Sequence, residues 1–78
     1  MSEWIIRGYD RQSERSVSVT TLHGVSREEL QELVGADPDD PLFDAYPMTA
    51  EAMQVLVGAG KVVAPEPDVD YFLEYWGA

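Results

Sequence analysis

The chain of 78 residues contains no cysteine and only one histidine. The absence of cysteine excludes disulfide bonds and thiolate chemistry, and it is compatible with a cytoplasmic protein. A Ser-His-Asp nucleophile would have to use His23, beside Gly24 at the end of a predicted strand, and no Gly-x-Ser-x-Gly segment accompanies it. Carboxylates are plentiful, but nothing singles out one pair for acid–base work, and a chain of this size leaves little room for a substrate pocket. We therefore expect no catalytic residue and no enzymatic activity.

Long hydrophobic runs are missing as well. Residues 1–7 lack the basic start and the apolar stretch of a secretory signal, and no window approaches the roughly 20 apolar residues of a membrane helix. We expect a soluble, cytoplasmic protein with no membrane partner. Hydrophobic residues still make up 45% of the chain, including two Trp, four Tyr and two Phe, which is typical of a globular domain. The length indicates a single domain over residues 1–78.

Basic residues are few, and they are unevenly placed. The chain has 15 acidic and five basic residues, a formal charge of −10. Residues 1–27 hold four arginines and three acids, whereas residues 28–78 hold twelve acids and one lysine. A strongly negative field repels nucleic acid and anionic membranes and speeds association with basic partners. Net charge also keeps small domains soluble, so the acidity alone leaves both interpretations open.

The first third of the chain is predicted to form an antiparallel β-hairpin. Residues 4–9 are rich in strand formers, residues 10–14 form a polar turn, and residues 16–21 alternate between β-branched and small polar side chains. The alternation predicts that Val17, Val19 and Thr21 lie on one face of a half-buried strand.

Two helices are predicted in the middle of the chain. Ser26 begins the first with Glu29 in a capping box, Val25 and Leu30 form a hydrophobic staple, and Gly35 ends it. Thr49 caps the second, which ends at residues 58–60. Core positions are expected where apolar residues recur at helical spacing. They are Leu30, Leu33, Val34, Ala52, Met53, Leu56 and Val57, together with Leu42 and Phe43 between the helices.

The sequence pattern of residues 61–76 fits more than one secondary structure. Residues 61–64 fit either a short strand or an extended linker. Val69, Phe72, Leu73 and Trp76 have helical spacing, yet residues 71–76 are so aromatic that a strand is equally natural. We favour the strand, because a lone two-stranded hairpin is marginally stable. The predicted fold is α+β: an N-terminal antiparallel β-hairpin, two helices and a C-terminal strand (ββααβ).

Motifs for metal and phosphate binding are incomplete. Asp37-x-Asp39 has the start of a calcium loop, but Leu42 replaces the required glycine and Met48 replaces the bidentate glutamate. Residues 58–61 resemble the end of a phosphate loop but lack the following Ser or Thr. We expect no metal site and no cofactor.

Acidic residues gather beside aromatic ones in two segments. Carboxylates next to exposed aromatic rings suit the recognition of Lys and Arg. The predicted partner-binding residues are Asp37, Asp39, Asp40, Asp44, Tyr46, Glu66, Asp68, Asp70 and Tyr75. The alternative is that the rings belong to the core and the acids to solvated turns.

Four short segments resemble a family of small bacterial proteins of unknown function, found especially in actinobacteria. They are Gly8-Tyr9-Asp10-Arg11, Leu22-His23-Gly24-Val25-Ser26, the run from Asp40 through Leu42, Tyr46 and Pro47 to Thr49, and Asp70-Tyr71-Phe72-Leu73-Glu74. The resemblance implies a shared fold and no particular activity. In size and charge the chain is also similar to immunity proteins and antitoxins that neutralise basic toxins.

These observations predict an acidic protein that binds and neutralises a basic protein partner, such as an immunity protein or antitoxin that inhibits a toxin domain. We expect that toxin domain to be a nuclease. The alternative is an oligomerising or regulatory interaction module, with a homodimer formed through a strand edge or an aromatic patch. Neither function involves direct contact with nucleic acid.

Overall fold

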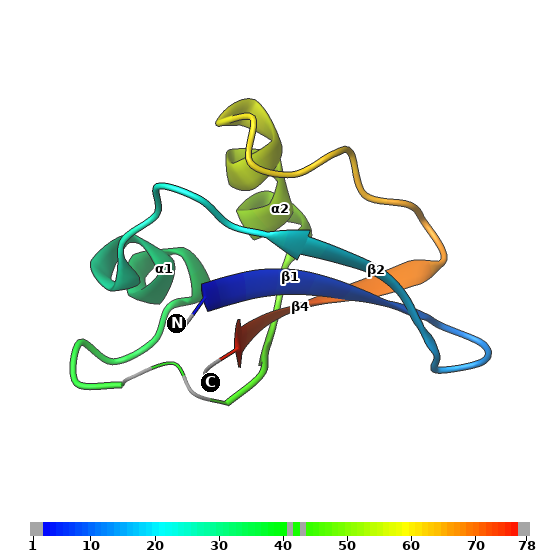
Figure 1. The fold of residues 1–78 in the computed structure, drawn as a ribbon, viewed down its shortest axis with the longest axis horizontal. Helices are drawn as coiled ribbons and strands as arrows, with labels where there is room; N and C mark the ends of the chain where they lie inside the picture. The colour runs from blue at the N-terminus through cyan, green and yellow to red at the C-terminus, as the bar shows by residue number, and fades with distance from the viewer. Residues whose placement is uncertain (1–2, 41, 43, 77–78) are drawn as a thin grey trace.

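The computed structural model describes residues 3–40, 42 and 44–76 as an antiparallel sheet of four strands with two helices (Figure 1). In chain order, the elements are β1 (Glu3–Asp10), β2 (Ser16–Thr21), α1 (Arg27–Val34), β3 (Tyr46–Pro47), α2 (Ala50–Gly58) and β4 (Val69–Trp76). The strand order is β2-β1-β4-β3. The predicted α+β class is confirmed, with the short β3 added to the expected ββααβ order.

Strand β1 lies inside the sheet because it pairs on both sides. It forms the predicted hairpin with β2 and pairs along its whole length with β4, from Glu3 opposite Trp76 to Asp10 opposite Val69. Residues 69–76 are therefore a strand, as favoured, and residues 61–68 form the linker that leads to it.

A β-bulge in the hairpin overturns one prediction. Val19 and Thr21 lie opposite Arg7 and Ile5, but the pairing slips between Gly8 and Tyr9 and leaves Val17 without a partner. Val17 then lines a hollow with Val69 and Tyr71 on the other side of the sheet, because the extra residue of a bulge changes the alternation of faces. A half-buried strand was predicted, but no residue of β2 is buried, and Val17 and Val19 are 55% and 54% exposed.

The two helices begin and end where the sequence predicts. The Ser26 hydroxyl accepts a hydrogen bond from the N–H of Glu29 at 3.2 Å, and the Thr49 hydroxyl accepts one from Ala52 at 3.1 Å. Gly35 follows α1 in the left-handed conformation, with φ 70°, which glycine adopts without steric cost.

The core lies between the helices and one face of the sheet. Ile6 and Leu73 pair across β1 and β4 and pack with Leu30 of α1 and Leu56 of α2. The other central members are Leu22, Leu42 and Met53, while the predicted core residues Leu33, Val34 and Val57 are only partly buried. Phe43, also predicted for the core, lies outside the described residues.

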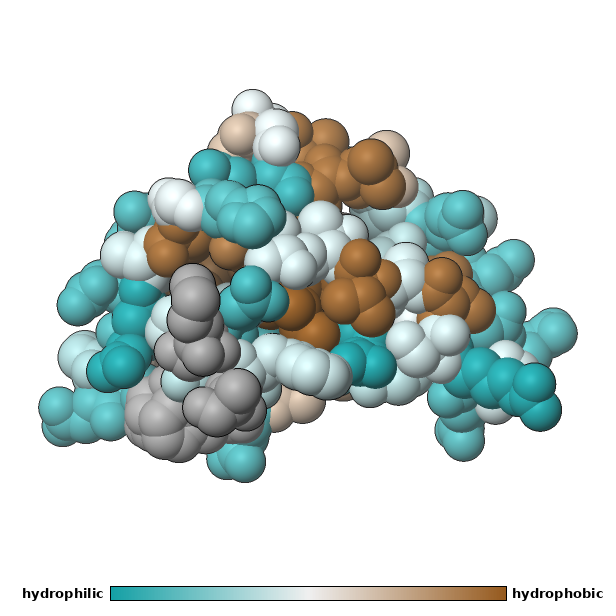
Figure 2. Space-filling model, in the orientation of Figure 1, coloured by the Kyte–Doolittle hydropathy of each residue, from teal (hydrophilic) through white to brown (hydrophobic). Residues whose placement is uncertain are grey.

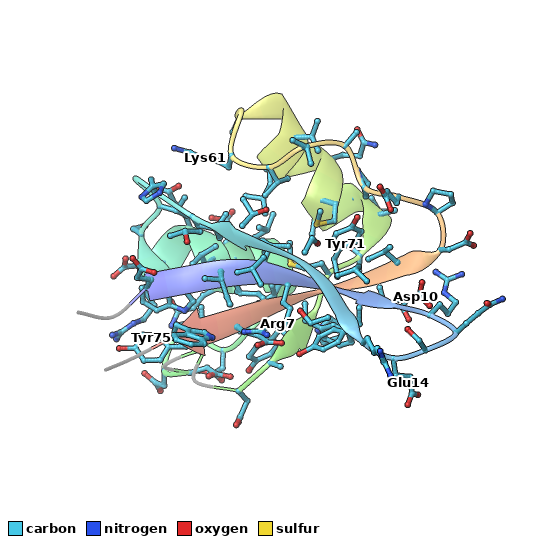
Figure 3. The ribbon with its side chains drawn as sticks, turned by 45° about the vertical axis from the view of Figure 1, so that its right-hand side comes forward. Arg7, Asp10, Glu14, Lys61, Tyr71 and Tyr75 are labelled. Atoms are coloured by element: carbon cyan, nitrogen blue, oxygen red, sulfur yellow. The ribbon has the colours of Figure 1, made fainter. Side chains whose placement is uncertain are left out.

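Both described helices lie on one face of the sheet, and in this part of the chain the opposite face carries no helix. Figure 3 shows Tyr71 on the side of the sheet that bears α2 and Arg7 on the other side. Within the described residues, neither helix is long and apolar enough to cross a membrane.

Candidate functional site

The first predicted acidic cluster, residues 37–46, mostly serves the loop that contains it. A carboxylate oxygen of Asp37 accepts from the N–H of Asp39 at 2.9 Å. Asp40 accepts from the N–H of Leu42 at 2.8 Å and, through its other oxygen, from the Tyr46 hydroxyl. These contacts hold Asp37, Asp39, Asp40, Leu42 and Tyr46 in place. Asp39 and Asp44 are exposed, and neither carboxylate has such a contact within the described residues.

A buried amide ties this loop to α1. Gln31 is 8% exposed, and its Nε2 donates to the carbonyl oxygens of Pro38 at 3.0 Å and Asp40 at 2.6 Å. A buried donor with two acceptors is stabilising, whereas the same carbonyls left unpaired would be costly. This segment therefore contributes to the stability of the fold as well as to the surface of the protein.

The second predicted cluster is partly neutralised by the hairpin turn. Arg11 Nη2 lies 3.1 Å from Asp70 Oδ1, in an exposed ion pair. Glu66 and Asp68 are exposed beside it. Tyr75, the remaining predicted contact, lies at the far end of β4, where its ring meets that of Trp4 edge-on at 5.1 Å.

The two predicted clusters do not come together. Residues 66–70 lie beside the turn between β1 and β2, and residues 37–40 and 44–45 lie toward the opposite end of the sheet (Figure 1). The eight residues of β4 alone span roughly 26 Å at about 3.3 Å per residue. The clusters therefore cannot form one compact binding site.

A groove between the two helices brings together other acidic residues. It has a volume of about 490 Å³. Its apolar lining is Leu33 of α1 with Ala52 and Val55 of α2, and Val55 is 59% exposed. A smaller hollow of about 90 Å³ shares Leu33 and Val55 and continues toward Lys61. The surface between the two helices is therefore open and partly apolar.

Three carboxylates line this groove. Glu29 and Glu32 come from α1 and Glu51 comes from α2. No ion pair involves any of the three within the part of the chain that the structure describes. Glu29 and Glu51 also lie in the first turns of their helices, where the helix dipole favours a negative charge. We take this inter-helix groove as the candidate binding site.

The sequence patterns predicted Glu29 only as part of a capping box, and they did not predict the groove. The signal was present, since both helices carry acids on their exposed faces and no base within them beyond Arg27. The sequence alone does not predict the distance between the two helices. That distance depends on how each helix packs on the sheet.

The helix-free sheet face has a different charge pattern. Arg7 Nε lies 3.1 Å from Glu74 Oε1, although its N–H does not point at that oxygen well enough for a hydrogen bond. The Tyr9 hydroxyl donates to Glu74 at 2.8 Å. This hydrogen bond, followed by desolvation, raises the pKa of Tyr9 above its ordinary value. The charges of this face are largely paired with each other.

No metal centre is found in residues 3–40, 42 and 44–76: no three His, Asp or Glu side chains there gather closely enough to hold an ion.

Comparison with protein families shows to which family the chain belongs. A family model described as a domain of unknown function (DUF7683) matches residues 3–74, so the chain belongs to this family. The match covers every strand and helix except the last two residues of β4, which confirms the predicted resemblance to a family of unknown function. No match was found among curated proteins or solved structures.

Proposed function

We propose that this member of the family is an acidic binding protein of the cytoplasm, whose partner is a basic protein that it neutralises. A toxin domain inhibited in the manner of an immunity protein or antitoxin is the form of this function we favour. The observation that carries the proposal is the inter-helix groove, which combines an apolar floor with three carboxylates that take part in no ion pair among the described residues.

The groove fits a basic amphipathic segment. Leu33, Ala52 and Val55 offer apolar surface to an aliphatic or aromatic side chain of the partner, and burial of such a side chain contributes about 1.5–3 kcal/mol. Glu29, Glu32 and Glu51 stand around that surface, where lysine or arginine side chains can form charge-assisted hydrogen bonds with them. Apolar anchoring and ion pairing would thus act in the same place.

The negative charge of the rest of the molecule also supports association with a basic protein. The net charge of −10 raises the rate of encounter with a positively charged protein and disfavours nucleic acid and anionic membranes. The exposed acids of the predicted clusters, among them Asp39, Asp44 and Glu66, add to this field. We assign to these exposed acids the electrostatic steering of the partner, and to the groove the direct contact with it.

The test compares two triple variants that remove the same charge. One replaces Glu29, Glu32 and Glu51 with Gln, and the control replaces Asp39 and Asp44 with Asn and Glu66 with Gln. The probe is a synthetic amphipathic peptide with lysines on one helical face and leucines on the other, measured by titration calorimetry at two salt concentrations. Three exposed ion pairs at about 0.5 kcal/mol each give a loss of roughly tenfold for the groove variant.

The control variant should lose much less affinity, and binding to the wild type should weaken as salt increases. Equal losses in both variants would show that net charge alone attracts the peptide and would remove the groove from the proposal. Absence of binding to the wild-type protein at low salt would refute the function itself.

A further inference from the structure

Strand β2 forms one edge of the sheet, and among the described strands it pairs only with β1 (Figure 1). An edge strand presents unpaired backbone N–H and C=O groups, which can pair with a strand of another chain. The opposite edge is less suited to this, because β3 has only two residues and one of them is Pro47, which has no N–H to donate.

The hydrogen-bond pattern shows which backbone groups of β2 face outward. The N–H of Leu22 donates to the carbonyl of Trp4 at 2.9 Å. In an antiparallel pair, hydrogen-bonded and non-bonded positions alternate, so the backbone groups of Thr20 also point toward β1. Those of Val19 and Thr21 point away from the sheet, into solvent.

The usual protection of an edge strand is weak in β2. Natural edges carry lysine, proline, or inward-pointing charges, or are covered by a helix or loop. Residues 16–21 read Ser-Val-Ser-Val-Thr-Thr and contain neither a charged residue nor a proline. Within the strand itself, the bulge at Val17 is the protective feature, and it leaves residues 18–21 in regular register with β1.

The surface around β2 is uncharged and includes exposed apolar side chains. Val17 and Val19 are both more than half exposed, and Figure 2 shows hydrophobic side chains among hydrophilic ones over the region of β2. Residues 16–26 include no acidic or basic residue other than His23, which makes them the longest uncharged run in a chain with twenty charged residues.

We propose that β2 is a self-association edge, at which two copies of the chain pair antiparallel and join their sheets into one. A second copy is the favoured occupant, because the uncharged run lets two strongly acidic chains meet where neither carries charge. With the two-fold axis at Val19, Val19 lies opposite its own copy and Thr21 lies opposite Val17. The outward backbone groups of Val19 then form reciprocal hydrogen bonds, as a two-fold interface requires.

This association is independent of the groove. The groove lies in the helix layer, between α1 and α2, whereas the edge is a strand of the sheet. The two also respond to salt in opposite ways. Salt screens the attraction between an acidic protein and a basic partner, but it screens the repulsion between two acidic copies, so it should strengthen the dimer.

The experiment is sedimentation velocity of the wild type, Val19→Lys and Gln54→Lys over a range of protein concentrations, at low and high salt. Gln54 is exposed on α2 and serves as the matched control for an added lysine. We expect a concentration-dependent dimer for the wild type and Q54K that is favoured by salt. V19K should raise the dissociation constant at least tenfold, because it puts a charge opposite its own copy.

Amide hydrogen exchange of the wild-type protein keeps the proposal testable if V19K fails to fold. The amide of Val19 should exchange more slowly as the protein is concentrated, while that of Thr20, already facing β1, should change little. A wild type that stays monomeric up to millimolar concentration would overturn the proposal. So would a dimer that V19K leaves intact, or one in which the Val19 amide gains no protection, as in pairing through the open sheet face.

Discussion

Replacing Gly8 with alanine should destabilise the fold, although alanine is normally the better residue in a strand. A methyl group built on Gly8 would lie 2.5 Å from Ser18 Oγ, 2.8 Å from Val69 Cγ1 and 3.0 Å from Tyr71 Cε1. The serine hydroxyl can rotate away. Val69 is buried and the Tyr71 ring packs against the core, so neither can move without disturbing its neighbours.

Two opposing effects set the size of the change. Overpacking of a filled site costs about 1–3 kcal/mol, while glycine in a strand interior is itself less stable than alanine by about 0.5–1 kcal/mol. From the middle of each range, the net loss for Gly8→Ala is about 1 kcal/mol, and the melting temperature should fall by about 4–8 °C for each kcal/mol in a domain of this size.

Gly58→Ala is the matched control. Gly58 is the last residue of α2, and a methyl group there would have no neighbour within 4 Å. This substitution should leave stability unchanged or raise it by up to about 1 kcal/mol. Urea unfolding followed by circular dichroism measures both variants. If Gly8→Ala were as stable as the wild type, the close approach of Tyr71 and Val69 to β1 would be wrong.

Two further predictions concern the loop and the hairpin turn. Gln31→Ala should cost about 1–3 kcal/mol of unfolding free energy, since two loop carbonyls lose their donor. Exposed Gln54→Ala on α2 should change stability by less than about 0.5 kcal/mol, and equal losses would contradict the role of the buried amide. The N–H groups of Ser13 and Gln12 lower the pKa of Asp10, so its stabilising effect should be present above the ordinary pKa of aspartate and be lost as pH falls through the lowered one. The stability difference between the wild type and Asp10→Ala should therefore shrink in acid; a difference independent of pH would contradict this.

Local patterns predicted the parts of the fold that local interactions decide. The caps at Ser26 and Thr49 and the turn after residue 10 depend on neighbours in the sequence, and the structure confirms them. Strand β3 has only two residues and exists because β4, more than twenty residues later, lies beside it. The bulge at Val17 depends on how β2 pairs with β1, and the burial of Gln31 depends on carbonyls outside its helix, those of residues 38 and 40.

The candidate site was harder to predict for the same reason. Composition indicates an acidic binding protein, but acidity alone does not say which carboxylates share a surface. The predicted set combined residues from opposite ends of the sheet. It also included Asp40 and Tyr46, whose side chains form a hydrogen bond with each other. Glu29 and Glu51 are far apart in sequence, and only the packing of two helices on one sheet places them at one groove.

The position of β1 also has a consequence for how the chain acquires its structure. Its first strand finds one neighbour nearby, but its other neighbour, β4, is separated from it by nearly sixty residues. Until β4 is in place, the inner strand of the sheet has an open side and β3 has nothing to pair with. Pairing across such a distance is slow, because the entropy of closing the intervening chain must be lost before the contacts form. During synthesis, a nascent chain that ends before residue 69 would have both helices and the hairpin but no completed sheet, so folding should wait for the last strand.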